Sequence, residues 1–242
     1  RGDPEPWVHV LPIPDSYRRE GTDFSSEAES ALEGAGEVAG LIIETMLSCA
    51  GQVPLPEEYL STTSEAVREK GGLLLADEVQ VGFGRVGTHM WAFEESGVIP
   101  DIVVMGKPMG NGHPMGAVFT TQDIASSFGS MEFFSTFGGN PVSCAIGSAV
   151  LDVIESENLM EAACSLGDRF LKGLHSLMES HEIVGDVRGR GLFLGFEMVR
   201  DRATKEPAAE AAVALVDSMR QNGILLSTDG PLHNVIKIKP PM

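Results

Sequence analysis

Two short stretches of the sequence place reactive side chains beside glycines. The first, LLLADEVQVGFGR at residues 73–85, ends an apolar run in the carboxylates Asp77 and Glu78. The second, VVMGKPMGNGHPMGAVF at residues 103–119, places Lys107 between an apolar run and a glycine-rich loop. A lysine at the mouth of an apolar crevice can be activated by desolvation as an imine-forming nucleophile. A carboxylate at a strand end in a partly apolar crevice is costly to bury unless a cation or a hydrogen-bond donor pairs with it, so Asp77 and Glu78 are candidate site residues or, on the plainer interpretation, a helix cap and a surface charge.

A phosphate-binding P-loop is excluded for the second stretch. The spacing GxxxxGK[ST] is absent, and Pro108 prevents a helix from starting with free amides just after Lys107. A third stretch, FFSTFGGNPVSC at residues 133–144, has the hydroxyls of Ser135 and Thr136 and a Gly-Gly-Asn turn before an expected helix. Hydroxyls and free amides at a helix start suit an anion, so this stretch is a candidate anion site.

The elements that must hold these residues follow from the apolar pattern. Short apolar runs predict strands at 38–44, 73–78, 102–105 and 116–119, with a helix at 56–69 between the first two. Runs of this kind are typical of strands buried on both faces, and a helix between two of them indicates a parallel βαβ unit. The first half is therefore predicted to be α/β. Because ligands bind beyond the carboxyl ends of parallel strands, Asp77 and Lys107 are expected at one edge of the sheet.

The second half predicts a smaller α+β domain. One helix is expected from residue 141, and a second at 159–181 is expected to bury one face, because its apolar residues recur at spacings of four and three. Further elements are expected at 192–198, 208–222 and 235–238. The predicted organisation is a solvated approach segment (1–37, helical only at 26–32), a partial cofactor-binding large domain (38–154) and a partial small C-terminal domain (155–242).

Composition excludes several classes of function. Seventeen Lys and Arg against 35 Asp and Glu give a net charge of −18, which disfavours nucleic acid and anionic membranes as partners. No apolar run approaches the roughly 18 residues that cross a bilayer. The three cysteines, Cys49, Cys144 and Cys164, form no CxxC pair and are expected to be buried apolar residues without a disulfide or a metal. A cytoplasmic location is expected, and a mitochondrial one stays open.

Taken together, LLLADEVQVGFGR, GKPMGNGHP and TFGGNP resemble the fold-type I, class III pyridoxal-phosphate aminotransferases. The resemblance implies that Lys107 carries the internal aldimine with pyridoxal 5'-phosphate, and that Asp77 faces the pyridine nitrogen and keeps it protonated. It also implies that Gln80 lies near the 3-hydroxyl of the ring and that Val79 packs on a ring face. Thr136 would bind the cofactor phosphate of the neighbouring subunit, which implies a homodimer acting on a small amine or amino acid.

Two departures from the family pattern bear on the reaction. Transaminating members carry EPIQGEGG after the strand that ends here at Glu44, and an Arg in an IRFAPP-like segment near the C-terminus. Here these stretches are ETMLSCAGQ and IKIKPPM, so the gating Glu falls on Cys49 and the Arg on Lys237. The departures resemble phospho-lyases of ethanolamine phosphate or 5-phosphohydroxylysine. In these, a quinonoid expels phosphate, and hydrolysis then gives an aldehyde and ammonia.

The lyase is therefore the favoured function, with Lys237 and Lys239 as candidates to help phosphate leave. A transaminase of the alanine–glyoxylate or ω-amino type is the alternative, because a lysine can also hold a carboxylate as a point charge. The family's N-terminal phosphate loop, ring-stacking aromatic residue and final helix have no counterpart here, so the sequence is expected to be part of a longer protein. An inactive piece or a non-catalytic binding module is the second alternative. Glu78 is expected to be structural, Arg85 a loop or interface residue, and His113 the histidine to test.

Overall fold

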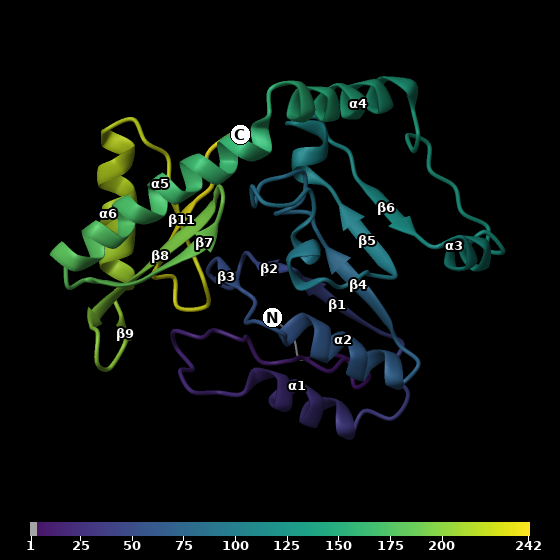
Figure 1. Ribbon diagram of the computed structural model, residues 1–242, viewed down its shortest axis with the longest axis horizontal. Coiled ribbons are helices and arrows are strands. Elements are labelled where there is room, and N and C mark those ends of the chain that lie inside the picture. Colours follow the sequence, from purple (N-terminus) through teal and green to yellow (C-terminus); the bar gives the residue numbers. More distant parts are fainter. Residues whose placement is uncertain (1–3) are drawn as a thin grey trace.

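The computed structural model describes residues 4–242 and has a larger and a smaller α/β unit side by side (Figure 1). The helices are α1 (Phe24–Glu33), α2 (Tyr59–Glu69), α3 (Gln122–Phe128), α4 (Pro141–Ser156), α5 (Leu159–Ser180) and α6 (Ala209–Gln221), with short 3-10 helices η1 (Ala92–Ser96) and η2 (Lys107–Gly110). The strands are β1 (Gly40–Glu44), β2 (Met46–Leu47), β3 (Val53–Pro54), β4 (Leu73–Asp77), β5 (Ile102–Met105), β6 (Ala117–Thr120), β7 (Val184–Arg190), β8 (Phe193–Asp201), β9 (Glu206–Pro207), β10 (Ser227–Asp229) and β11 (Val235–Ile238).

The larger unit is built on a four-stranded sheet in the order β1-β4-β5-β6. Strands β1, β4 and β5 run parallel, and β6 returns antiparallel to β5. The predicted α/β class and the βαβ unit β1–α2–β4 are confirmed. The pairing places Glu44 opposite Asp77, and Asp77 opposite Val104, so three strands end at the same edge.

The core of the larger unit lies under one face of this sheet. Leu60 of α2 and Leu74 of β4 are buried together with Val98, because Leu74 lies on the face of β4 that α2 covers. The N-terminal segment adds a second cluster, in which Phe24 and Ala28 of α1 pack against Tyr59. The prediction of a solvated segment at 1–37 was therefore wrong for α1, because its apolar residues lie on one buried face of the helix. Residues 1–3 of the chain lie outside the described part.

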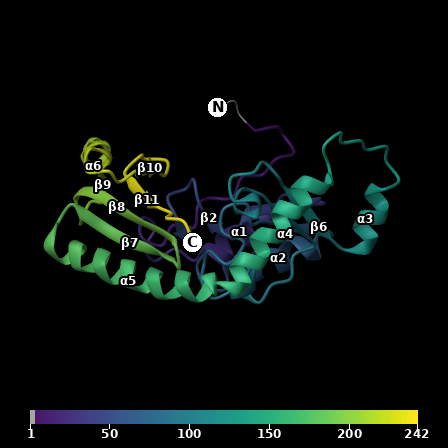
Figure 2. The same ribbon diagram turned by 90° about the horizontal axis from the view of Figure 1, so that it is seen from above.

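The smaller unit is a five-stranded sheet packed against α5 and α6, and Figure 2 shows α5 lying along it. Leu174 of α5, Ala212 of α6 and Phe196 of β8 share one buried cluster. The predicted buried stripe on α5 was wrong in part, because the helix turns a neighbouring face to the sheet. Its exposed apolar side chains are Leu166 (44 %), Phe170 (40 %) and Leu177 (47 %).

The two units meet at a seam of very close backbone contacts. Phe193, at the start of β8, is fully buried among residues of the larger unit that include Val81 and Val86. The turn between β7 and β8 reaches the same loop at Gly191, whose φ is +50°. A Cβ on Gly191 would lie 2.5 Å from the Arg85 carbonyl oxygen. The glycine is therefore required there, because a side chain fits neither the space nor the left-handed conformation.

Arg85 ties this seam together. Its guanidinium donates to the carbonyl oxygens of Leu192 at 3.1 Å and Pro240 at 2.9 Å, and its own carbonyl accepts from Leu192 N at 2.9 Å. Burial lowers the pKa of this guanidinium. The expectation of a loop or interface residue is refined, since Arg85 links the loop after β4 to the C-terminal segment within one chain.

Candidate functional site

Asp77 closes β4 at the carboxyl edge of the larger sheet. It is half-buried, and one oxygen, Oδ1, accepts from Val79 N at 2.9 Å. Within residues 4–242 no cationic side chain forms an ion pair with it. A half-buried carboxylate without a cation suits a ligand that brings its own positive charge.

Lys107 begins η2 directly after β5, one strand away from Asp77. Its φ is +21°, and the side chain is exposed. No carboxylate of the described residues pairs with its amine. Non-glycine residues rarely have positive φ, and such positions cluster at functional sites. The backbone conformation of Lys107 therefore supports its assignment as a candidate site residue.

Val79 and Gln80 lie beside this pair. A Cβ placed on Gly106, the residue before Lys107, would lie 3.5 Å from Cγ1 of Val79. Gln80 is half-buried, and its Oε1 accepts from Lys239 Nζ at 3.4 Å. The structure thus brings Asp77, Val79, Gln80 and Lys107 to one place, called the lysine edge below. A carboxylate without a cationic partner, an amine without a carboxylate partner and a neighbouring apolar side chain fit the protonated pyridine ring and the aldehyde of pyridoxal phosphate.

Glu78 belongs to the scaffold, as expected. Its buried carboxylate accepts from Thr45 Oγ1 at 2.6 Å and from the backbone amides of Ala92 and Phe93, each at 3.0 Å. Burial raises its pKa, and the three donors oppose that rise. The residue therefore links η1 to the β1–β2 connection.

The C-terminal strand β11 brings two lysines close to the site. Lys237 Nζ pairs with Asp229 Oδ2 at 3.1 Å, and the same oxygen accepts from Gln52 Nε2 at 3.3 Å. Lys239 Nζ lies 4.3 Å from the centre of the Phe193 ring. Burial, and next the charge of Lys237, lower the pKa of Lys239 to about 8. The two lysines are therefore chemically distinct.

The expected gate position is occupied by a turn. Cys49 is exposed, and its carbonyl accepts from Gly230 N at 3.2 Å. Glu44 is held nearby by Ser48, whose hydroxyl donates to Oε1 at 2.6 Å. The expectation of buried cysteines was wrong, because Cys49 lies in a surface turn. Cys144 is likewise exposed, on α4, and Cys164 is only partly buried.

Thr136, in the third motif region, lies apart from the lysine edge. Thr136 is exposed in the loop between α3 and α4, which Figure 1 shows at the end of the molecule away from the smaller unit. No hydrogen bond of the described residues joins Thr136 to the other predicted site residues. His113 in the lysine loop pairs through Nε2 with Ser143 Oγ at 2.8 Å, which anchors the loop to α4.

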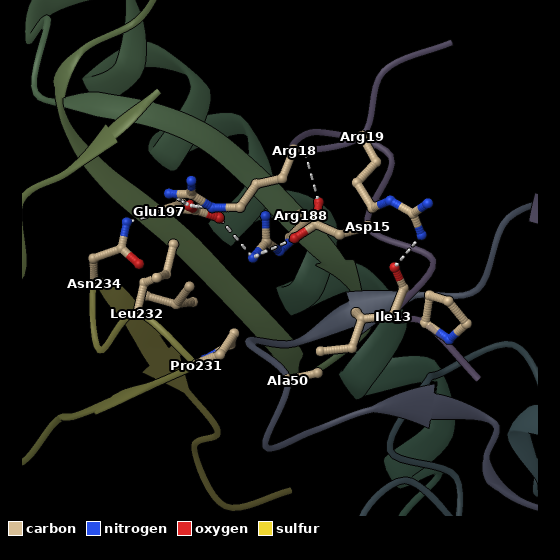
Figure 3. Close-up of a pocket in the computed structure, with 12 residues that line it drawn as sticks. Ile13, Asp15, Arg18, Arg19, Ala50, Arg188, Glu197, Pro231, Leu232 and Asn234 are labelled. Carbon is tan, nitrogen blue, oxygen red and sulfur yellow. Dashed lines mark hydrogen bonds and ion pairs between the residues drawn. The ribbon is translucent and has the colours of Figure 1, made fainter. Parts of the chain in front are cut away.

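Sequence reasoning missed one buried charge cluster. Arg188 and Glu197 form an ion pair at 2.9 Å with side chains 9 % and 1 % exposed, and Arg18 pairs with the same carboxylate. Figure 3 shows Arg188 between Asp15 and Glu197 at the wall of a cavity of about 310 Å³. No local motif announces the cluster, because its members come from distant parts of the chain. It joins the N-terminal segment to the smaller sheet and lies outside the lysine edge.

Comparison with known proteins agrees with this geometry. The parallel sheet with a lysine and an aspartate at its carboxyl edge, followed by a small α+β domain, matches solved pyridoxal-phosphate-dependent enzymes of fold type I. The family model for Aminotransferase class-III matches residues 3–242. The chain therefore belongs to the class III aminotransferase family, whose members are pyridoxal-phosphate-dependent enzymes.

The individual relatives include proteins named as aminotransferases and proteins named as phospho-lyases. The chain is 47 % identical to an alanine–glyoxylate aminotransferase 2-like protein of Drosophila melanogaster, over 100 % of this chain and 53 % of the relative. It is 41 % identical to an ethanolamine-phosphate phospho-lyase homolog 1 of Caenorhabditis elegans, over 98 % and 56 %. A solved phospholyase from Arthrobacter in complex with phosphoethanolamine matches with a TM-score of 0.89 and 39 % identity, over 96 % and 58 %.

The chain thus spans about half the length of the curated relatives that it matches. None of the helices in the described residues has the length and apolar character needed to cross a membrane.

Proposed function

We propose that the whole protein is a pyridoxal-phosphate-dependent phospho-lyase that removes phosphate and ammonia from a small phosphorylated amine. The observation that carries the proposal is the ion pair between Lys237 of β11 and Asp229, because the resemblance aligns Lys237 with the substrate-binding arginine of transaminating members. A paired lysine is a poor ligand for the carboxylate of a keto acid, because it would have to give up its partner and lacks the bidentate geometry of arginine.

The residues of the lysine edge have separate tasks in this proposal. Lys107 attaches the cofactor covalently, and Asp77 compensates the charge on the pyridine nitrogen. Val79 packs on the ring and Gln80 lies near its 3-hydroxyl. The bound cofactor supplies an electron sink for the bonds of the amine-bearing carbon.

Lys107 also moves the proton. Once the substrate amine has displaced it from the cofactor, its free Nζ removes a proton from the amine-bearing carbon. The bond from the neighbouring carbon to the phosphate oxygen then breaks, and phosphate leaves with the bonding electrons. Addition of water to the remaining product gives an aldehyde and ammonia.

A homodimer completes the site in this proposal. Thr136 lies in an exposed loop with Phe133, Phe134 and Phe137, which are 70 %, 83 % and 81 % exposed. Apolar side chains at this exposure favour a covering partner, and a second copy would bring Thr136 to the cofactor phosphate of its neighbour. Sedimentation of the full-length protein at twice the monomer mass is the expected result, and a monomer that binds cofactor fully would contradict it.

The transaminase stays as the second candidate, because the chain is 47 % identical to a relative named for alanine–glyoxylate transamination. The deciding experiment measures inorganic phosphate released from ethanolamine phosphate by the full-length protein without any keto acid. The proposal predicts continuous release over many turnovers. Activity that requires pyruvate or glyoxylate, with no phosphate release, would favour the transaminase. A cytoplasmic location is proposed with it, and cell fractionation tests it.

A further inference from the structure

We infer that Lys239, and not Lys237, binds the anionic group of the substrate at the lysine edge. The inference rests on the proposed function, because it assigns the substrate's oxyanion to a residue of that same site. The ligand chemistry is a phosphate monoester, or a carboxylate that occupies the same contact. The two amines differ in their ion pairs and in their positions.

Lys237 is already neutralised by its own sheet. Its amine pairs with Asp229, and the strand pairing of β10 with β11 keeps the two residues on neighbouring strands. Gln52 donates to the same carboxylate oxygen and fixes its orientation. An incoming anion would have to compete with this carboxylate, whose side chain is only 15 % exposed.

Lys239 has no such partner. No carboxylate of residues 4–242 forms an ion pair with it, and its contacts are the face of the Phe193 ring and the Gln80 oxygen at 3.4 Å. Gln80 follows Asp77 and Val79 at the end of β4, so the amine lies at the lysine edge. A half-buried amine with a ring and one weak acceptor still has donors left for a ligand.

The backbone around Lys239 is fixed on both sides. Ile238 pairs with Leu194 in the sheet, and the Pro240 carbonyl accepts from Arg85 at 2.9 Å. Two prolines follow the lysine, which further restricts the chain. The backbone that carries the Lys239 side chain is therefore placed in advance, which reduces the entropy lost when an anion binds.

Charges of both signs lie around Lys239. Lys237 and Arg85 act to expel its proton, and Asp229 and Glu44 act to keep it, with burial the largest effect, so that its pKa is about 8. A bound oxyanion would add negative charge at close range and raise that pKa again. Anion binding through Lys239 should therefore weaken as the pH rises through 8, because the amine loses its charge.

A labelling experiment tests the contact without turnover. The full-length protein is acetylated at lysines with and without millimolar inorganic phosphate at constant ionic strength, and each site is quantified by peptide mass spectrometry. Phosphate should slow labelling of Lys239 by about tenfold, as one charged hydrogen bond predicts, and leave Lys237 and the exposed Lys172 of α5 unchanged. Acetate in place of phosphate shows whether a carboxylate binds equally. Protection of Lys237 alone, or of neither lysine, overturns the inference.

Variants separate this inference from the proposed function. With ethanolamine phosphate, Lys239→Gln should raise KM by tenfold or more, and Lys237→Gln by much less, with the cofactor absorbance of both variants unchanged. If the wild-type protein releases phosphate but Lys239→Gln has the same KM, the inference fails and the proposed function stands. If phosphate protects Lys239 but the protein binds no cofactor, the anion contact stands and the proposed function fails.

Discussion

Substitution by alanine is expected to have opposite effects on stability at two glycines of α5, because only one of them lies at the seam between the two units. A Cβ on Gly167 would lie 2.3 Å from the carbonyl oxygen and 2.6 Å from the carbonyl carbon of Gly191. No side-chain rotation relieves that overlap, because the obstacle is backbone. The turn at Gly191 also packs closely against the backbone of Arg85. A shift of α5 would therefore disturb the loop after β4.

The magnitudes follow from two opposing terms. Alanine in a helix interior is favoured over glycine by about 1 kcal/mol. At Gly167 this gain is offset by an overlap whose typical cost is ~1–3 kcal/mol, and more where backbone must move. We therefore expect Gly167→Ala to lower the free energy of unfolding by about 2 kcal/mol, which is roughly 4–8 °C in Tm for a chain of this size.

Gly173→Ala is the matched control. Gly173 lies in the same helix, is exposed, and has nothing within 4 Å of the added Cβ. It should raise stability by about 1 kcal/mol through helix propensity alone. Urea unfolding of the three proteins, followed by circular dichroism, measures both changes. If Gly167→Ala is as stable as Gly173→Ala, the close packing at the seam is refuted.

Further substitutions test the charged residues. Arg188→Leu leaves Glu197 short of a partner and should cost about 3 kcal/mol of stability in denaturant unfolding; an unchanged midpoint would contradict the buried pair. Asp77→Asn should weaken pyridoxal-phosphate binding in equilibrium dialysis by tenfold or more at unchanged stability, since only the charge compensation is lost. Glu78→Gln should instead lower the free energy of unfolding by ~1–3 kcal/mol. If Glu78→Gln weakened cofactor binding and Asp77→Asn lowered stability, the roles assigned to the two carboxylates would be wrong. The pKa of Lys239 is lowered from 10.5 to about 8 in the folded protein, so between these pH values the unfolded chain binds more protons. The destabilising effect of this lysine on the fold should therefore decrease as the pH rises from 8 to 10.5. The stability of Lys239→Met relative to wild type should therefore be higher at pH 7 than above pH 10.5; a pH-independent difference would refute the shift.

The sequence was sufficient to place the main site residues because they directly follow apolar runs. Asp77 and Lys107 each come at the end of a parallel strand, and such ends share an edge in any sheet of this kind. Resemblance supplied their expected roles, which the geometry alone does not assign. The helix and strand positions followed from periodicity for the same local reason.

Residues acting across long sequence separations were beyond that reasoning. No local sequence pattern indicates that Lys239 contacts Gln80 or that Lys237 pairs with Asp229. These contacts depend on how β11 packs in the smaller sheet and against the larger unit. The buried face of α5 was misplaced for a related reason, since Gly167 lets the helix approach a turn that apolar spacing does not reveal.

Attachment of the cofactor to Lys107 can be measured directly by reductive labelling. The full-length protein is incubated with pyridoxal 5'-phosphate, reduced with borohydride and digested, and the phosphopyridoxyl label is located by peptide mass spectrometry. We expect a single stoichiometric label on Lys107, which is absent from Lys107→Ala. A label on Lys239 or another lysine, or no label in wild-type protein, would contradict it.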